Sequence, residues 1–341
     1  MQFGLTASYV LMMLAFAVPG YILIKSKAVK EGAIKAFSAM LLYVNQPFLS
    51  IYSFQQAEYT PRLLGDLGIV FVLSAALQII MMLALYFAFK AAKKRKIKAL
   101  PQAIDFALLP ESDGARALFE QTGKREIERA ARSRVFVLTS TFGNVGFLGV
   151  PLLQALLPDH PEAVLFSATY IVSMNLLCWT LGLTLMTGDK RYLSVKKLLI
   201  NPPVMALCIA LPLFFTGVAL PPAVSSGIEF LARMTTPLCM LILGMRFATV
   251  NLKELFKDGG LYFAASMKLV VFPLLCLAAV SFLPVNPVIK TTLFILCCMP
   301  SASVVLNLAE INRTGQKTAA NVILISTLFS MITVPILLLL A

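Results

Sequence analysis

Charged side chains are scarce in this chain. Only 13% of its 341 residues are Asp, Glu, Lys or Arg, whereas a soluble domain carries roughly a quarter. Hydrophobic residues make up 59% of the sequence, and the mean hydropathy is +0.86. This composition excludes an ordinary soluble domain and predicts an integral membrane protein in the lipid bilayer.

The sequence also lacks the residue patterns of common enzymes. Its one histidine, His160, stands alone in a PDHPE turn, and there is no glycine-rich phosphate loop with a lysine. All six aspartates fall in loops or at the ends of apolar runs, so no aspartate pair can activate water inside the membrane. We therefore predict no enzymatic activity, no metal site and no cofactor.

Cysteine and basic residues each have a simple interpretation. The six cysteines lie inside apolar stretches without metal-ligand spacing and are interpreted as small packing residues. Lys and Arg outnumber Asp and Glu by 29 to 16, and they gather between the apolar runs. Membrane orientation explains this excess better than a nucleic-acid partner, which we do not expect.

Apolar runs of about 20 residues, the length of a helix that crosses a bilayer core, recur along the chain. They predict an all-α protein with ten transmembrane helices. The first run is long enough to span and has no positive region before it, so we expect a retained first helix. The predicted spans are 4–24, 33–55, 66–89, 134–157, 163–187, 198–217, 222–245, 260–283, 288–311 and 317–340.

Basic residues fall almost entirely in alternate loops, as they do where those loops face the cytoplasm. One set of loops includes the long connection 90–133, whereas the other set holds only Arg62 and Lys290. We therefore expect a multi-pass protein of a plasma membrane, the cytoplasmic membrane in a bacterium, with both termini on the non-cytoplasmic side. The mixed charges of 90–133 are typical of an amphipathic cytoplasmic helix.

Five spans in each half imply that a second copy enters the membrane from the opposite side. We expect two inverted five-helix repeats, residues 1–187 with the cytoplasmic loop 90–133 and residues 188–341. Spans two and seven each carry a polar pair before a proline, Pro47 or Pro237. We interpret both prolines as packing kinks or as corresponding points of the two repeats.

Interruptions in spans four and nine are the strongest functional signal. Span four carries FGNVGFLGVP (142–151), opposite MPSASVV (299–305) in span nine. If both helices unwind at mid-membrane, each yields a second half-helix whose positive end attracts anions. Asn144 and Ser301 stand where these half-helices would begin, and both residue types are favoured caps. The alternative is two kinked helices with water-satisfied backbones.

Two further features of this region concern the backbone. Gly143 permits a close backbone approach, and Pro300 removes a hydrogen-bond donor. Uncharged polar residues at suitable depth can orient a carboxylate or form interhelical hydrogen bonds. These candidates are Asn45, Gln46, Gln78, Asn175, Ser303 and Asn307.

Ionisable residues inside the spans are candidates for ion coupling. Lys268 in span eight either extends its stem to the cytoplasmic headgroups or serves as counter-charge for an anion or a carboxylate. Glu310, near the cytoplasmic end of span nine, is either interfacial, a proton-coupling acid or the partner of Lys268. Asn307 is grouped with them, and the coupling ion, proton or sodium, stays open.

At these residues the chain resembles the auxin efflux carrier family, whose prokaryotic members include permeases for malate, malonate and similar acids. The likeness covers the whole chain and rests on GNVGFLGVPLL (143–153), NLLCWTLG (175–182), Asn201-Pro202-Pro203 and MPSASVVLNLAE (299–310). It implies two inverted repeats whose broken helices four and nine cross beside the substrate. It also implies a scaffold of spans one, two, six and seven, with spans three to five and eight to ten as a transport domain in elevator-like motion.

The chain departs from plant members of that family in two places. Gly143 stands where they place a proline before the asparagine, and the extended loop follows span three instead of span five. A prokaryotic permease is therefore the better match, and auxin is not the expected substrate. A homodimer through the scaffold helices is suggested by analogy alone.

We predict a secondary active transporter of a small organic anion, a carboxylate, bound where the two interrupted helices cross. The absence of a carboxylate pair in the spans weakens the case for a cation–proton antiporter. Two alternatives stay open. One is a sodium-coupled organic-anion symporter with a fold like that of bile-acid transporters, and the other is a membrane sensor that binds its ligand and signals through 90–133.

Overall fold

The computed structural model describes residues 8, 12, 15–55, 60–99, 128–187, 202–249 and 255–340. Within these ranges the chain is helical and contains no strand, which confirms the all-α class for this part of the protein. Residues 4–7, 9–11, 13 and 14 of the predicted span 4–24, residues 198–201 and residues 100–127 of the long connection lie outside the described residues.

Among the residues that the structure describes, five helices have the length and apolar composition needed to cross a membrane. They are Pro61–Ala92, Glu162–Thr187, Pro222–Thr249, Gly259–Ser281 and Gln316–Leu340. Two shorter apolar helices are Val145–Leu156, which follows one of the interruptions described below, and Pro287–Cys298, which precedes the other. The count of ten spans and their inverted relation therefore stay predictions.

The first half of the chain contains long helices with single turns of π-helix inside them. Its elements are α2 (Val18–Lys25), α3 (Ala33–Met40), η1 (Leu41–Asn45), α4 (Gln46–Gln55), α5 (Pro61–Ala99), a helix over 128–141, η3 (Val145–Gly149), α7 (Val150–Leu156), α8 (Glu162–Leu177), η4 (Cys178–Gly182) and α9 (Leu183–Thr187). The long helix α5 extends beyond both ends of the predicted span 66–89.

The second half follows a similar order. Its elements are α11 (Pro202–Thr216), α12 (Pro222–Arg233), α13 (Thr235–Thr249), α15 (Gly259–Ser266), η6 (Met267–Val271), α16 (Phe272–Ser281), α17 (Pro287–Cys298), α18 (Val304–Ile311), α19 (Gln316–Leu337) and η7 (Leu338–Leu340). Proline stands in the first turn of α12 and α17, where its missing N–H has no helical partner to lose.

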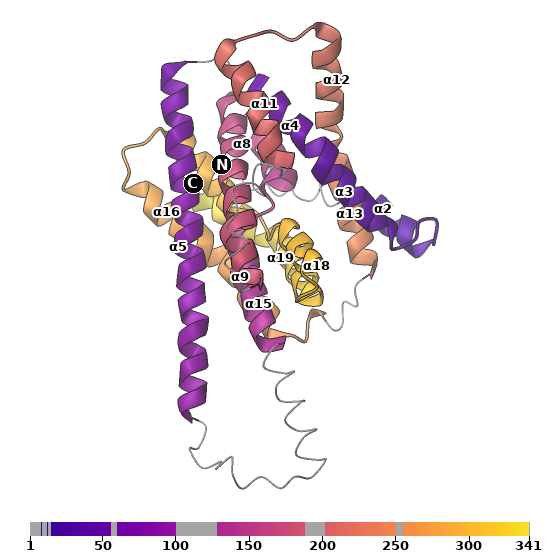
Figure 1. Cartoon of the computed structure of the whole chain (residues 1–341), viewed down its shortest axis with the longest axis vertical. Helices are drawn as coiled ribbons and strands as arrows, with labels where there is room; N and C mark the ends of the chain where they lie inside the picture. The colour runs from indigo at the N-terminus through magenta and orange to yellow at the C-terminus, as the bar shows by residue number, and fades with distance from the viewer. Residues whose placement is uncertain are drawn as a thin grey trace.

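The helices pack in two groups. In one group α2 packs on α13, and α4 packs on α11 and α12. In the other, α5 packs on α8, α15 on α19, and α17 on both α8 and α16. Figure 1 shows α2, α3, α12 and α13 on the right, with α5 and α16 on the left. Contacts of α8 with α4 and α11 join the two groups.

Glycine allows α2 and α13 to touch through their backbones. A Cβ atom on Gly20 would lie 2.0 Å from the carbonyl oxygen of Leu241, and one on Gly244 would lie 1.7 Å from that of Ala17. Small residues at helix contacts are the usual device for close packing in membranes, where lipid supplies little hydrophobic drive between helices. These two glycines therefore fix the separation of α2 and α13.

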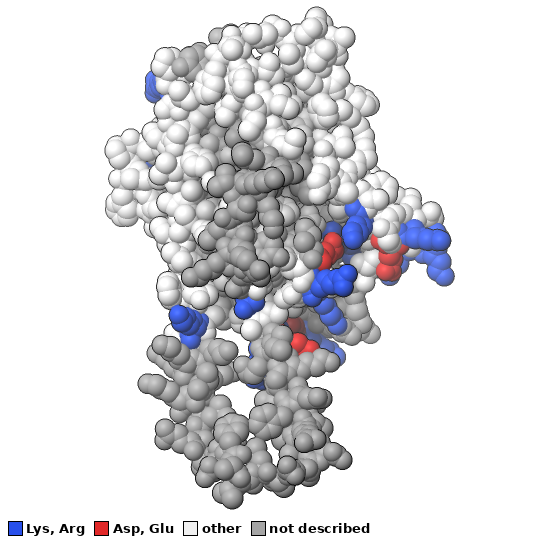
Figure 2. All heavy atoms as spheres, in the orientation of Figure 1, with Lys and Arg blue, Asp and Glu red and all other residues white. Residues whose placement is uncertain are grey.

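The outer surface is largely apolar. Large side chains such as Phe230 and Phe282 are 68% and 89% exposed, as expected for residues that face lipid. In Figure 2 the upper part of the face is nearly free of charge, whereas Lys and Arg gather lower down and over the projecting turn between α2 and α3.

The cysteines are all free, and five of the six are buried. Their interpretation as small packing residues is confirmed for these five. Cys208 on α11 is exposed instead, since this helix turns much of its surface outward.

Candidate functional site

Two segments interrupt the helices at the positions of the glycine and proline motifs. Helical geometry stops after Thr141 and resumes at Val145, and it stops again after Cys298 and resumes at Val304. The intervening residues, 142–144 and 299–303, are here called the paired interruptions. Each interruption breaks the regular hydrogen bonding of its helix, so the peptide groups of these residues need other partners.

The paired interruptions supply those partners to each other. Gly143 and Ser301 form an isolated antiparallel bridge. The amide of Asn144 donates to the carbonyl of Pro300 at 2.6 Å, and the amide of Ala302 donates to that of Phe142 at 2.9 Å. The two segments therefore hold together as a short two-stranded contact without any need for water.

Ser301 strengthens this contact from within the protein. Its side chain is fully buried, and its hydroxyl donates to the Thr139 carbonyl at 2.8 Å while its amide donates to the Ser326 hydroxyl at 3.1 Å. The expectation that Ser301 begins the second half-helix is wrong by two residues, because the N-cap of α18 is Ser303. Neither Asn144 nor Ser303 makes a side-chain cap bond.

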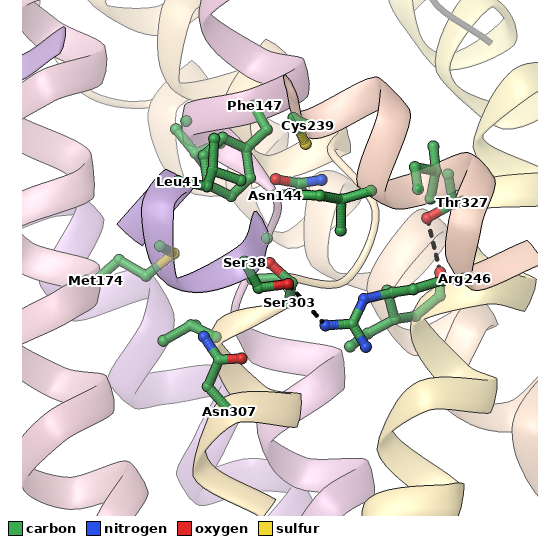
Figure 3. Close-up of a pocket in the computed structure, with 18 of the residues that line it drawn as sticks. Ser38, Leu41, Asn144, Phe147, Met174, Cys239, Arg246, Ser303, Asn307 and Thr327 are labelled. Carbon is green, nitrogen blue, oxygen red and sulfur yellow. Dashed lines mark hydrogen bonds between the residues drawn. The ribbon is translucent and has the colours of Figure 1, made fainter. Parts of the chain in front are cut away.

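A cavity of about 70 Å³ lies beside the paired interruptions. Its polar lining includes Asn144, Asn175, Arg246, Ser303 and Asn307. Figure 3 shows Arg246 extending from α13 toward Ser38 and Ser303, with Asn144 above these two serines in the view and Asn307 below them. The described lining contains no acidic side chain.

Two helix starts border this cavity. Asn144 and Gly146 line it where η3 and α7 begin, and Ser303 and Val304 line it where α18 begins. The start of a helix has free N–H groups and carries about half a positive charge. The cavity is therefore bordered by two positive helix ends in addition to the guanidinium.

Arg246 is a site residue that the sequence analysis missed. Its side chain is half-buried, and its Nη2 atom donates to the Ser38 hydroxyl at 3.3 Å. Its Nε atom is buried without a hydrogen-bond partner among the described residues, and the charge of Glu310 acts on it. A planar guanidinium with unused donors matches the geometry of a carboxylate.

The reason for missing Arg246 is the position of a helix end. The predicted span ended at residue 245, which left Arg246 in a loop, whereas α13 continues to Thr249. The sequence offered one signal for this longer helix. Ala248 continues the apolar spacing of three residues set by Ile242 and Met245, and the structure buries all three side chains.

Lys268 lies inside the protein and does not extend toward the headgroups. Its side chain is fully buried, and Nζ donates to the carbonyl of Cys297 at 3.0 Å. The ammonium lies 4.4 Å from the ring centroid of Phe272 and would be 3.0 Å from a Cβ atom on Gly143. In the part of the chain that the structure describes, no carboxylate forms an ion pair with it.

The structure brings together about half of the predicted site. Gly143, Asn144, Asn175, Ser303 and Asn307 line the cavity, although the Asn175 amide donates to the Ile171 carbonyl of its own helix at 2.9 Å. The predicted residues outside the described lining are Asn45, Pro300, Ser301, Lys268 and Glu310.

Of the candidates outside the cavity lining, Asn45 joins two helical elements. Asn45 is fully buried, and its amide donates to the Leu231 carbonyl at 3.0 Å, which joins η1 to α12. The side chain of Gln46 lies outside the described residues. Across the described ranges, no cluster of three or more His, Cys, Asp or Glu side chains is arranged to hold a metal ion.

An apolar helical protein whose interrupted helices border a polar cavity has the architecture of a membrane transporter. The chain belongs to the membrane transport protein family, the auxin efflux carrier family, whose model matches residues 128–338. The match includes both interruptions, Arg246 and Lys268, and it confirms the resemblance read from the motifs.

A relative from Methanocaldococcus jannaschii, described as an uncharacterized transporter, is 26% identical over 204 residues. The alignment covers 58% of this chain and 65% of the relative, so less than two thirds of the relative's length is represented. The similarity supports membership among membrane transporters.

Proposed function

We propose that this protein is a secondary active transporter of a small organic anion that carries a carboxylate. The charge around the cavity supports this substrate class. Arg246 is the one charged side chain in the described lining, and the helix starts at Asn144 and Ser303 add positive potential. An anion is stabilised by all three groups, whereas a cation meets no opposite charge in the described lining.

The size of the cavity favours a small substrate. One water molecule needs about 10–15 Å³ of such space, so a volume of about 70 Å³ accommodates roughly five water-sized groups. This corresponds to a short-chain acid. Asn307, one helical turn beyond Ser303 on α18, adds an amide that can accept or donate a hydrogen bond to it.

The cavity lies between two groups of helices, and this position supports the proposed elevator mechanism. Ser38, Leu41 and Arg246 come from the group formed by α2–α4 and α11–α13, which we propose as the scaffold. Asn144 and Ser303 come from the other side, which we propose as the transport domain. A ligand between two packed groups of helices is exposed to either face of the membrane when one group slides along the other, as in an elevator.

Apolar side chains on the scaffold side of the cavity suit such sliding. Leu41, Ile242 and Leu243 line it without hydrogen bonds that must break during movement.

The proposal includes two inverted repeats, interruptions at mid-membrane, both termini outside the cytoplasm and a homodimer through the scaffold. The gathering of basic side chains over one part of the surface supports the orientation.

Transport by the purified protein in liposomes tests this function. We expect saturable uptake of at least one radiolabelled acid from a panel of mono- and dicarboxylates, and no uptake by protein-free liposomes. Absence of saturable flux for the entire panel overturns the proposal. Tight binding without flux, together with a change in protease sensitivity of residues 90–133, would identify a sensor instead.

A further inference from the structure

The paired interruptions have two electrical poles. The helix over 128–141 and α17 both end at them, whereas η3 and α18 both begin there. Helix ends carry partial negative charge on free carbonyl groups, and helix starts carry partial positive charge on free amides. The cavity lies at the positive pole, where an anion is favoured.

Lys268 occupies the negative pole. Its Nζ atom donates at 3.0 Å to the carbonyl of Cys297, in the last turn of α17. The nearest atoms to a Cβ on Gly143 are Lys268 Nζ and Cε, followed by the Met299 carbonyl oxygen at 3.5 Å. The ammonium thus lies beside Gly143 of one interruption and at the end of α17, which leads into the other.

The charge of this side chain requires an explanation beyond packing. A fully buried ammonium is costly when it has no carboxylate partner, and none is paired with it among the described residues. An apolar side chain of similar length would fill the same space without that cost. The groups that favour the charge are the Cys297 carbonyl, the end of α17 and the face of Phe272.

In transporters with interrupted helices, unwound carbonyl groups and helix ends of this kind coordinate the coupling sodium ion or proton. We propose that the Lys268 ammonium is a resident cation that takes the place of a sodium ion at this pole, so that anion transport requires no sodium. This inference rests on the proposed transport function. Lys268 is then a positioning residue. It stabilises the backbone conformation of the paired interruptions while the anion binds on the other side of Gly143.

The test compares flux in media that contain sodium, potassium or choline as the main cation. Wild-type flux is expected to be equal in all three. In Lys268→Met we expect flux to fall about tenfold or more, because a charged hydrogen bond to the backbone is lost. Sodium or methylammonium should restore part of it, since either cation can enter the vacated space.

Two further variants control for effects on folding. Lys268→Arg keeps the charge and should retain sodium-independent flux above that of Lys268→Met. Lys290→Met makes the same chemical change at a half-buried lysine whose Nζ contacts the Ser281 carbonyl at 3.5 Å, outside the described cavity lining. This variant should transport like the wild type in every medium.

The possible failures are distinguishable. Wild-type flux that collapses in choline overturns the resident-cation inference and leaves the transport function intact. Full activity of Lys268→Met, or an inactive but folded Lys268→Met that no cation rescues, also overturns it. Absence of wild-type flux in all media overturns the transport function itself. If Lys268→Met does not fold, the cation series on the wild type decides the matter.

Discussion

Replacing Arg246 by glutamine should weaken substrate binding without unfolding the protein. The guanidinium uses Nη2 for the Ser38 hydroxyl, and its Nε atom has no partner among the described residues, so donors are available for an anion. Glutamine keeps a polar side chain of moderate length but has neither the charge nor the fork of donors that pairs with a carboxylate.

The size of the effect follows from the burial of Arg246. A hydrogen bond to a charged group contributes about 1.5–3 kcal/mol, and the half-buried position of Arg246 places the effect at the lower end. A loss of about 1.5–2 kcal/mol corresponds to a KM that rises about ten- to thirtyfold. Arg246→Lys keeps the charge without the planar fork and should show a smaller increase.

Uptake in liposomes over a range of substrate concentrations measures this KM. Arg233→Gln is the matched control, because Arg233 lies on the neighbouring helix α12 and pairs with Glu229 on the surface at 2.6 Å. Its KM should equal that of the wild type. A KM for Arg246→Gln that also equals the wild-type value would refute a contact between Arg246 and the anion.

Three further substitutions test the surrounding structure. Asn144→Ala should lower flux about tenfold or more while leaving folded protein in the membrane, because a donor to the charged substrate is lost; unaltered uptake would remove it from the site. Ser301→Ala should cost about 1–3 kcal/mol of stability by leaving a buried acceptor unpaired. Thermal unfolding in detergent measures this cost, and an unshifted midpoint contradicts it. Gly244→Ala should lower the unfolding midpoint because its Cβ would lie 1.7 Å from the Ala17 carbonyl oxygen, whereas Gly227→Ala meets nothing within 4 Å and should not.

Properties that depend on local sequence could be predicted in advance. The predicted span 33–55 is helical over the same residues as α3, η1 and α4, and the predicted span 163–187 differs by one residue from Glu162–Thr187. Apolar runs determine where a chain can enter lipid, so their positions can be read directly. The family was also accessible, because its motifs are contiguous in sequence.

Helix ends were less predictable than helix positions. Hydropathy indicates which residues lipid accepts, but a helix continues into water as long as its residues favour helical geometry. The helix α5 therefore runs to Ala99, beyond the predicted end at residue 89, and α13 runs to Thr249. The second of these differences placed Arg246 outside the predicted site.

Side-chain direction depends on neighbours that sequence does not reveal. Lys268 was equally compatible with headgroup contact and with an internal role, and the contacts with Cys297 and Phe272 decide between them. Ser301 and Ser303 stand two residues apart in one motif, yet only Ser303 lines the cavity because the bridge to Gly143 turns Ser301 inward.

The length of α5 has a practical consequence. Its 39 residues extend about 58 Å at 1.5 Å per residue, whereas the hydrocarbon layer is about 30 Å thick. One continuous helix therefore connects the interior of the bilayer with the aqueous phase. If α5 moves together with the bound anion, this movement changes the distance between Ala92 and the membrane surface. A spin label at the exposed Ala92 would measure that change.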